Sequence, residues 1–231
     1  MHMPPYRIER TRNRHSRALL RDDTIVIRLA RGLSVREEQA HVTNLLTRMI
    51  RVASREAART AINPFRPLLD GITDALTLAL STGERISFRL RAGKRSQARR
   101  TDTGWEITAG PSLRQRTLHR YLWKLLATAS VPTLSKRIDE VNRATFDVRI
   151  GEIRIRTMSS QWGSCSTHGT ITLTTALLLL PEELLRYVII HELAHRLHRR
   201  HSPAFWNAVG SACPDYAHMR KMLRGYRLSK L

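Results

Sequence analysis

The most constraining feature of this chain is a histidine motif that follows an apolar run. His191 and His195 enclose Glu192, and residues 187–190 before them are Tyr, Val, Ile and Ile. Residues four apart lie on one face of a helix, about 6 Å apart along its axis, so two imidazoles can share one ion. Glu192 lies about 100° around the helix, near enough to hold a water on that ion. Because buried imidazoles and carboxylates need partners, the motif predicts a buried helix that carries a metal site.

A third protein ligand is needed if water is to keep the last coordination position, and two histidines compete for that role. On a continuous helix His198 returns to the same face, but it lies about 10 Å along the axis from His191. Ser202 followed by Pro203 is typical of a helix start, so we expect the chain to turn before it. Such a turn can bring His201 back toward the pair. We therefore predict His201 as the third ligand and His198 as a residue beside the site or facing the substrate.

The chain is expected to divide near the Gly-Pro dipeptide at residues 110–111. Residues 1–110 predict a β-rich region of unknown role, with strands on both sides of a turn at Asp22-Asp23 and a long helix capped by Ser34. Within this region, residues 89–100 carry six basic residues and no acid. This pattern is typical of a solvated loop, or of a loop that faces phosphate.

Residues 111–231 predict a catalytic domain that contains both helices and strands. Two helical segments are expected over 113–129 and 134–145, and the helix of the histidine motif is expected from Pro181 through His195. Alternating strand-like segments lie between them. Residues 171–175 predict either a sheet edge that holds an extended peptide or an ordinary buried strand. The fold class is therefore α+β.

The charge of the chain bears on its partners more than on its fold. Forty Lys and Arg residues stand against 19 Asp and Glu residues, for a net charge of +21. This surplus favours acidic partners such as nucleic acid or nucleotides, although solvated arginine faces explain it equally well. The first residues lack an apolar stretch, and no apolar run is long enough for a bilayer. With only two cysteines, we expect a cytoplasmic protein with reduced thiols and no membrane partner.

Five motifs, in this order along the chain, resemble the YgjP-like metallopeptidase family, which is related to the SprT-like zinc proteins. They occupy residues 160–166 (SQWGSCS), 180–181 (LP), 187–195 (YVIIHELAH), 201–206 (HSPAFW) and 213–216 (CPDY). The likeness covers residues 149–226 and, more weakly, residues 6–59. It implies a zincin-like catalytic domain, in which the active-site helix packs on a small antiparallel sheet. It also implies one Zn²⁺ held at His191, His195 and His201, with Glu192 as the general base.

Two positions depart from related patterns. Gln161 stands where the YgjP-like family usually has a basic residue, so substrate preference can differ here if that charge touches substrate. The spacing of the three histidines equals that of metzincins, which have a glycine where this chain has His198. Histidine tolerates the tight turn less well, and this argues against metzincin geometry. Tyr216 is expected either to pack near the site or to donate a hydrogen bond to a developing oxyanion.

Three functions are compatible with this sequence. The leading hypothesis is a zinc-dependent peptidase that uses a metal-activated water. The second keeps the site but hydrolyses a nucleotide such as UTP, an activity credited to one member of the resembled family. Arg196, Arg199 and Arg200 would favour that substrate, although no Gly-rich phosphate loop is present. The third is an enzyme held on DNA by its basic surface, as in SprT-like proteins.

Overall fold

The computed structural model describes residues 4–21 and 24–228, and these form two compact units, Met1–Thr60 and Ala61–Leu231. Each unit is described by itself. The turn expected at Asp22-Asp23 lies outside the described residues. The predicted division after residue 110 falls inside the second unit, because strands on both sides of it share one core. The functional division at that residue stays a prediction.

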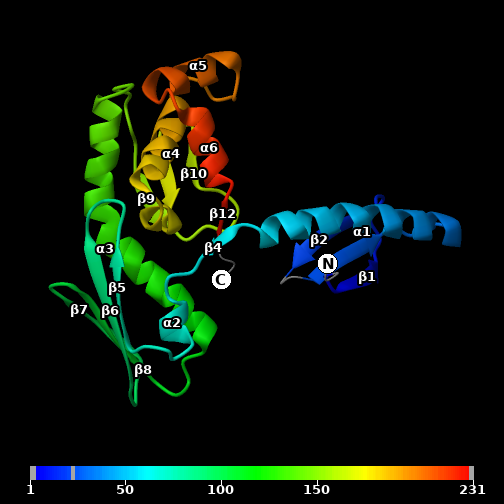
Figure 1. Cartoon of the computed structure of the whole chain (residues 1–231), viewed down its shortest axis with the longest axis horizontal. Helices are drawn as coiled ribbons and strands as arrows, with labels where there is room; N and C mark the ends of the chain where they lie inside the picture. The colour runs from blue at the N-terminus through cyan, green and yellow to red at the C-terminus, as the bar shows by residue number, and fades with distance from the viewer. Residues whose placement is uncertain (1–3, 22–23, 229–231) are drawn as a thin grey trace. The chain divides into compact units, whose positions relative to one another are not determined.

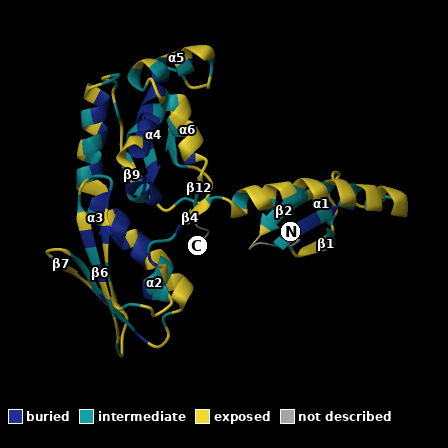
Figure 2. Ribbon diagram, viewed as in Figure 1, coloured by how far each residue is buried: buried dark blue, intermediate teal, exposed yellow. Residues whose placement is uncertain are grey.

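The first unit is a three-stranded sheet covered by one long helix (Figure 1). Its elements are β1 (Tyr6–Arg10), β2 (Arg17–Arg21), β3 (Thr24–Leu29) and α1 (Val35–Ala57). The central strand β3 pairs parallel with β1 and antiparallel with β2. Ile25, Ile27 and Leu29 of β3 are buried and pack against apolar side chains of α1, such as Leu45 and Met49. Figure 2 shows the remaining faces of α1 as exposed.

Local polar contacts define the ends of these elements. Ser34 caps α1 as predicted: its side chain accepts from the backbone N–H of Glu37, and the Glu37 carboxylate accepts from the Ser34 backbone N–H.

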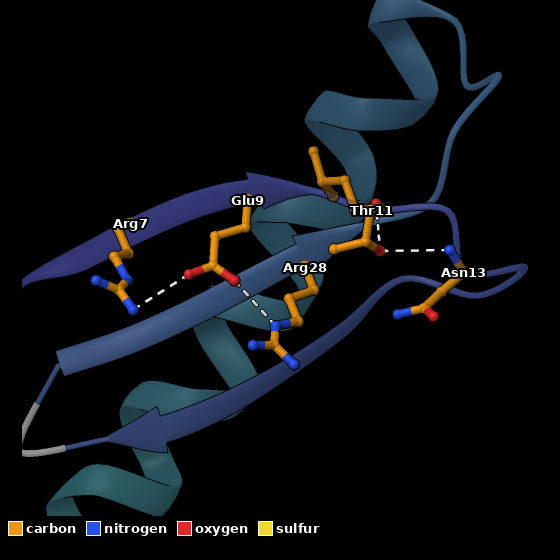
Figure 3. A network of polar contacts seen from close by, with 6 residues as sticks. Arg7, Glu9, Thr11, Asn13 and Arg28 are labelled. Carbon is orange, nitrogen blue, oxygen red and sulfur yellow. Dashed lines mark hydrogen bonds and ion pairs between the residues drawn. The ribbon is translucent and has the colours of Figure 1, made fainter.

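Glu9 on β1 lies opposite Arg28 on β3 and accepts a hydrogen bond from its Nε at 2.9 Å (Figure 3). Arg7 lies 3.1 Å from the same carboxylate, and these contacts, Arg28 first, hold the pKa of Glu9 below its usual value.

The second unit is α+β, as predicted, with helices packed on two main sheets. Its elements up to the long helix are β4 (Thr60–Ile62), α2 (Arg66–Leu69), β5 (Ala75–Ala79), β6 (Arg85–Ala92), β7 (Gln97–Thr101), β8 (Gly104–Ala109) and α3 (Gln115–Arg143). After α3 come β9 (Ile153–Arg156), β10 (Gly163–Cys165), β11 (Ile171–Thr174), the 3₁₀ helix η1 (Thr175–Leu179), α4 (Glu182–Ala194), α5 (Pro203–Ala212), α6 (Tyr216–Leu223) and β12 (Tyr226–Leu228). Within the described residues, no helix is both long and apolar enough to cross a membrane.

A single helix, α3, replaces the two helices predicted over 113–129 and 134–145. Pro132 lies inside it, where it removes one backbone hydrogen bond but does not end the helix. The reason is burial on both sides of the proline, since Leu126 and Leu134 are fully buried in the same core. The tertiary contacts of α3 therefore outweigh the local cost of Pro132. The helix spans from the β5–β8 sheet to the β9–β11 sheet and packs on both.

The sheet beside the histidine helix has the strand order β10-β11-β9. β10 and β11 are antiparallel, as expected for this fold, but β9 pairs parallel with β11, so the sheet is mixed. The two pairing directions arise because β10 and β11 form an antiparallel hairpin, and β9 pairs with the other side of β11 in the parallel direction. Residues 171–174 are therefore the buried central strand, and β10 and β9 are the two edges of the sheet. Figure 1 shows α4 lying against these strands.

Candidate metal centre and its cavity

The helix α4 holds the first two histidines through its burial in the core. Pro181 occupies the N-cap, and Glu182 and Glu183 follow at the positive end of the helix dipole. Nine of the 13 residues of α4 are buried, and Figure 2 shows most of this helix in the colour of buried residues. The ring centroids of His191 and His195 lie 5.2 Å apart, so the helical spacing does place the two imidazoles side by side.

The turn after α4 brings His201 to the pair. Ser202 caps α5, because its side chain accepts from the backbone N–H of Phe205. His201 Nε2 lies 3.1 Å from His191 Nε2. One ring nitrogen from each of His191, His195 and His201 can be chosen so that all three lie within 4.8 Å of one another. The three histidines therefore converge from α4, its C-cap and the turn that leads to α5.

His198 contributes its backbone rather than its ring. Its carbonyl oxygen lies 3.2 Å from Nδ1 of His195, which leaves Nε2 of that ring free to face the other histidines. The His198 side chain belongs neither to the histidine cluster nor to the cavity lining. His198 therefore lies beside the site, one of its two predicted positions, and contacts His195 through its backbone carbonyl.

An aromatic stack supports His201 from outside the cavity. The Trp206 ring stacks on His201 at 5.6 Å between centroids, and the Tyr216 ring stacks on Trp206 at 5.4 Å. The guanidinium carbon of Arg220 lies over the Trp206 ring, 4.9 Å from its centroid. Tyr216 is absent from the residues that line the cavity. Its position therefore agrees with the packing role among its two predicted roles.

Glu192 is buried beside the three histidines, and the backbone of β10 lies against it. A methyl group added at Gly163 would lie 2.7 Å from Glu192 Oε1, closer than real contacts allow. Burial raises the pKa of Glu192 to about 8. A divalent cation nearby would oppose this shift, because an opposite charge favours the ionised carboxylate. Gly163 is thus required for the close approach of β10 to this carboxylate.

The histidines themselves are suited to bind a cation. The pKa of His191 is lowered to about 4, mainly by burial and also by electrostatic repulsion from His195, His201 and Arg220. The pKa of His195 is lowered as well, mainly by burial. Both rings are consequently neutral near pH 7, and a neutral imidazole is the form that binds metal.

A cavity of about 380 Å³ opens over this cluster. Its lining consists of Gln161, Gly163, Ser164, Cys165, Ser166, Thr167, His191, Glu192, His195, Arg199 and His201. Gln161, singled out in the sequence, does face the cavity. Of the three arginines considered for a nucleotide, only Arg199 lines it. Arg196 instead donates to the backbone carbonyls of Arg149 and Thr167, and so ties the turn after α4 to the β10–β11 loop.

Sequence reasoning missed the contribution of β10. The Gly163 backbone and the polar residues 164–167 form one wall of the cavity, opposite the histidines. The segment 160–166 carries a signal for this wall of the cavity. Its glycine lies directly after a partly buried tryptophan and starts a strand, where a close backbone approach is the usual reason for glycine.

Comparison with known proteins identifies the family of this chain. A model of the YgjP-like metallopeptidase domain matches residues 14–226. The chain belongs to the YgjP-like metallopeptidase family. Membership extends the likeness noted in the sequence through residues 60–148, and it makes the protein a metal-dependent hydrolase of the metallopeptidase type.

Two solved structures are similar to part of the chain. The metallopeptidase zymogen abylysin of Pyrococcus abyssi is 27% identical, with a TM-score of 0.37, over 41% of this chain and 98% of its own. The metallopeptidase zymogen jannalysin of Methanocaldococcus jannaschii is 23% identical, with a TM-score of 0.32, over 38% of this chain and 93% of its own. No curated protein matches the chain.

Proposed function

We propose that the protein is a zinc-dependent peptidase in which His191, His195 and His201 hold the metal. The observation that carries this proposal is the convergence of the three rings. Two nitrogens bound to one tetrahedral zinc at 2.0–2.1 Å each lie roughly 3.3 Å apart, and the His191 and His201 Nε2 atoms are separated by 3.1 Å. Two neutral imidazoles gain little from such an approach unless a proton or a cation lies between them. The residues present therefore fit the ion, and three imidazoles suit zinc.

Glu192 is proposed as the general base. Zinc, when bound, supplies the Lewis acidity that activates water and polarises a peptide carbonyl. Glu192 takes the proton from the attacking water and passes it to the leaving amine. The close backbone at Gly163 restricts the carboxylate to one side of the cavity, which keeps it directed at the reacting water.

The edge strand β10 is proposed to align the peptide. β10 pairs with β11 on one side only, and its residues line the cavity on the other. An edge strand presents unpaired backbone N–H and C=O groups, and an extended peptide can pair with them. We therefore propose strand addition at residues 163–165 rather than at the buried strand 171–174.

A nucleotide substrate receives less support from the cavity. A triphosphate is held best by several cations, and Arg199 alone among the described Lys and Arg residues lines this cavity. Association with nucleic acid through the basic surface stays a prediction, with no bearing on the chemistry of the site.

The proposed function is tested by substitution of the general base. We expect Glu192→Gln to retain zinc, measured by elemental analysis, while cleavage of unstructured peptides falls below detection.

Among the proposed zinc ligands, His201→Ala should lose zinc during dialysis. His198→Ala should keep it, because the backbone carbonyl of residue 198 remains. Retained peptide cleavage in Glu192→Gln, or retained zinc in His201→Ala, would contradict the proposal.

A further inference from the structure

The cavity over the histidines has an uneven charge distribution. Among the residues that the structure describes, Glu192 is the one acid that lines it, and this carboxylate is buried against Gly163. Arg199 is the only Lys or Arg among the described lining residues, and its side chain is exposed. The residues between these two groups along β10 and its loop are uncharged: Ser164, Cys165, Ser166 and Thr167. A substrate in the cavity therefore meets one permanent positive charge from a described side chain, that of Arg199.

Arg199 lies beside the turn that follows β10. Its Nη2 approaches the backbone carbonyl of Thr167 at 3.5 Å, which places the guanidinium beside the loop that follows β10. Glu192 adjoins Gly163 at the start of β10. Thr167 is four residues after Gly163, so the two lie at most about 13 Å apart, and a peptide alongside β10 reaches from Glu192 to Arg199 within about four residues.

The guanidinium of Arg199 is free to bind a ligand. Of its five N–H donors, one makes the long contact to Thr167, and no carboxylate in the described residues pairs with it. Arg196, three residues earlier, carries the structural contacts of this turn, with hydrogen bonds of 3.0 and 3.1 Å to two carbonyls. Arg199 is consequently not needed to hold the loop.

We infer that Arg199 forms a carboxylate-binding subsite, which selects peptides with Asp or Glu within about four residues of the scissile bond. This inference rests on the proposed peptidase function. The planar guanidinium donates two parallel N–H···O hydrogen bonds to one carboxylate. A single amine or amide does not offer this geometry. The net charge of +21 acts in the same direction, because it concentrates acidic peptides around the protein.

The experiment uses the full-length zinc-loaded protein and a set of quenched fluorescent peptides. All peptides share one cleavable core, and Glu, Gln or Lys is placed in turn at each of four positions on either side of the bond. For wild type, we expect one position at which Glu gives a kcat/KM about 5- to 10-fold above Gln. Arg199→Gln should abolish this ratio but retain cleavage of the Gln peptides. Arg199→Glu should reverse the preference, so that the Lys peptide becomes the better substrate at that position.

Two further variants separate charge recognition from structure. Arg199→Lys keeps the charge without the planar fork, and should restore part of the preference for Glu. Arg200→Gln is the matched control, because this neighbouring arginine is exposed and does not line the cavity. It should leave the ratio of Glu to Gln peptides unchanged. Zinc content measured for each variant shows whether the metal centre is intact.

The outcomes distinguish this inference from the proposed function. If wild type cleaves Glu and Gln peptides equally at all eight positions, the subsite is overturned while the peptidase stands. A uniform loss for all peptides in Arg199→Gln, with zinc retained, assigns Arg199 to the loop and also overturns the inference. If wild type cleaves no peptide but releases phosphate from UTP in an Arg199-dependent manner, both proposals fail together.

Discussion

At the scale of single residues, the proposed function depends on close contacts between the candidate site residues and uncharged neighbours. Gly163 and Glu192 are separated by nearly thirty residues, yet there is no room for a methyl group between them. His195 receives its orientation from the carbonyl of His198, and His201 is supported by the ring of Trp206. The side chains that bear the chemistry therefore occupy positions set by neutral neighbours.

Gly163→Ala should displace the Glu192 carboxylate while leaving zinc in place. The added Cβ would meet Oε1 at 2.7 Å, and the carboxylate must rotate away from the reacting water. Misplacement of a catalytic group by about 1 Å costs on the order of 100-fold in rate, and we expect that loss in kcat/KM on a neutral peptide. Gly210→Ala on α5 is the matched control, because its Cβ meets Tyr216 at an ordinary 3.4 Å. Unaltered activity in Gly163→Ala would show that this approach does not position Glu192.

At the scale of elements, α3 joins the two sheets of the second unit. It carries Trp123, which is 1% exposed and packs edge-on against Phe65 at 5.5 Å between centroids. The indole N–H of Trp123 donates to Nε2 of His119 one turn earlier, at 3.0 Å. The indole N–H can donate only to an unprotonated Nε2, whereas Oδ1 of Asn63, 3.0 Å from the same nitrogen, accepts only from a protonated one. The docking of α3 against α2 and the β5–β8 sheet is thereby linked to pH.

His119 should make the second unit less stable in acid. Burial lowers the pKa of His119 below its ordinary value of 6.5, so the unfolded chain binds more protons than the folded one. The stability that neutral His119 contributes is present above pH 6.5 and is lost as the pH falls below that value. We expect His119→Gln to reduce the fall in the free energy of unfolding between pH 7 and pH 5. Urea titrations followed by tryptophan fluorescence measure this, and identical pH slopes for the two proteins would refute it.

At the scale of the whole molecule, the chain has two separate hydrophobic cores. One lies between β3 and α1 in the first unit, and the other contains residues of α3 and α4 in the second. The two cores share no buried residue. The free energy of unfolding of each unit should therefore change only with ligands bound to that unit and substitutions made in it.

Zinc should stabilise only the second unit. Binding to the folded state at 100 times the dissociation constant adds about 2.7 kcal/mol to its free energy of unfolding. Calorimetry should show two transitions, of which a chelator lowers only the one that belongs to the metal centre.

The first unit offers the complementary substitution. Ser34→Ala removes the cap of α1 and should destabilise the first unit by about 1 kcal/mol. It should lower the other transition and leave zinc content and peptide cleavage unchanged. One transition that moves with both zinc and Ser34→Ala would contradict the independence of the two cores.

The sequence by itself determined the features that depend on neighbours within a few residues. The caps at Ser34 and Ser202, the helix of the histidine motif and the side-by-side placement of His191 and His195 follow from local hydrogen bonds and helical periodicity. Only the tertiary structure decided that α3 continues through Pro132, because burial on both of its sides outweighs a local cost. It also decided that β10 is the sheet edge beside Glu192, and that Arg199 rather than Arg196 faces the cavity. These outcomes depend on which distant segments pair and pack together, and local sequence patterns do not carry that information.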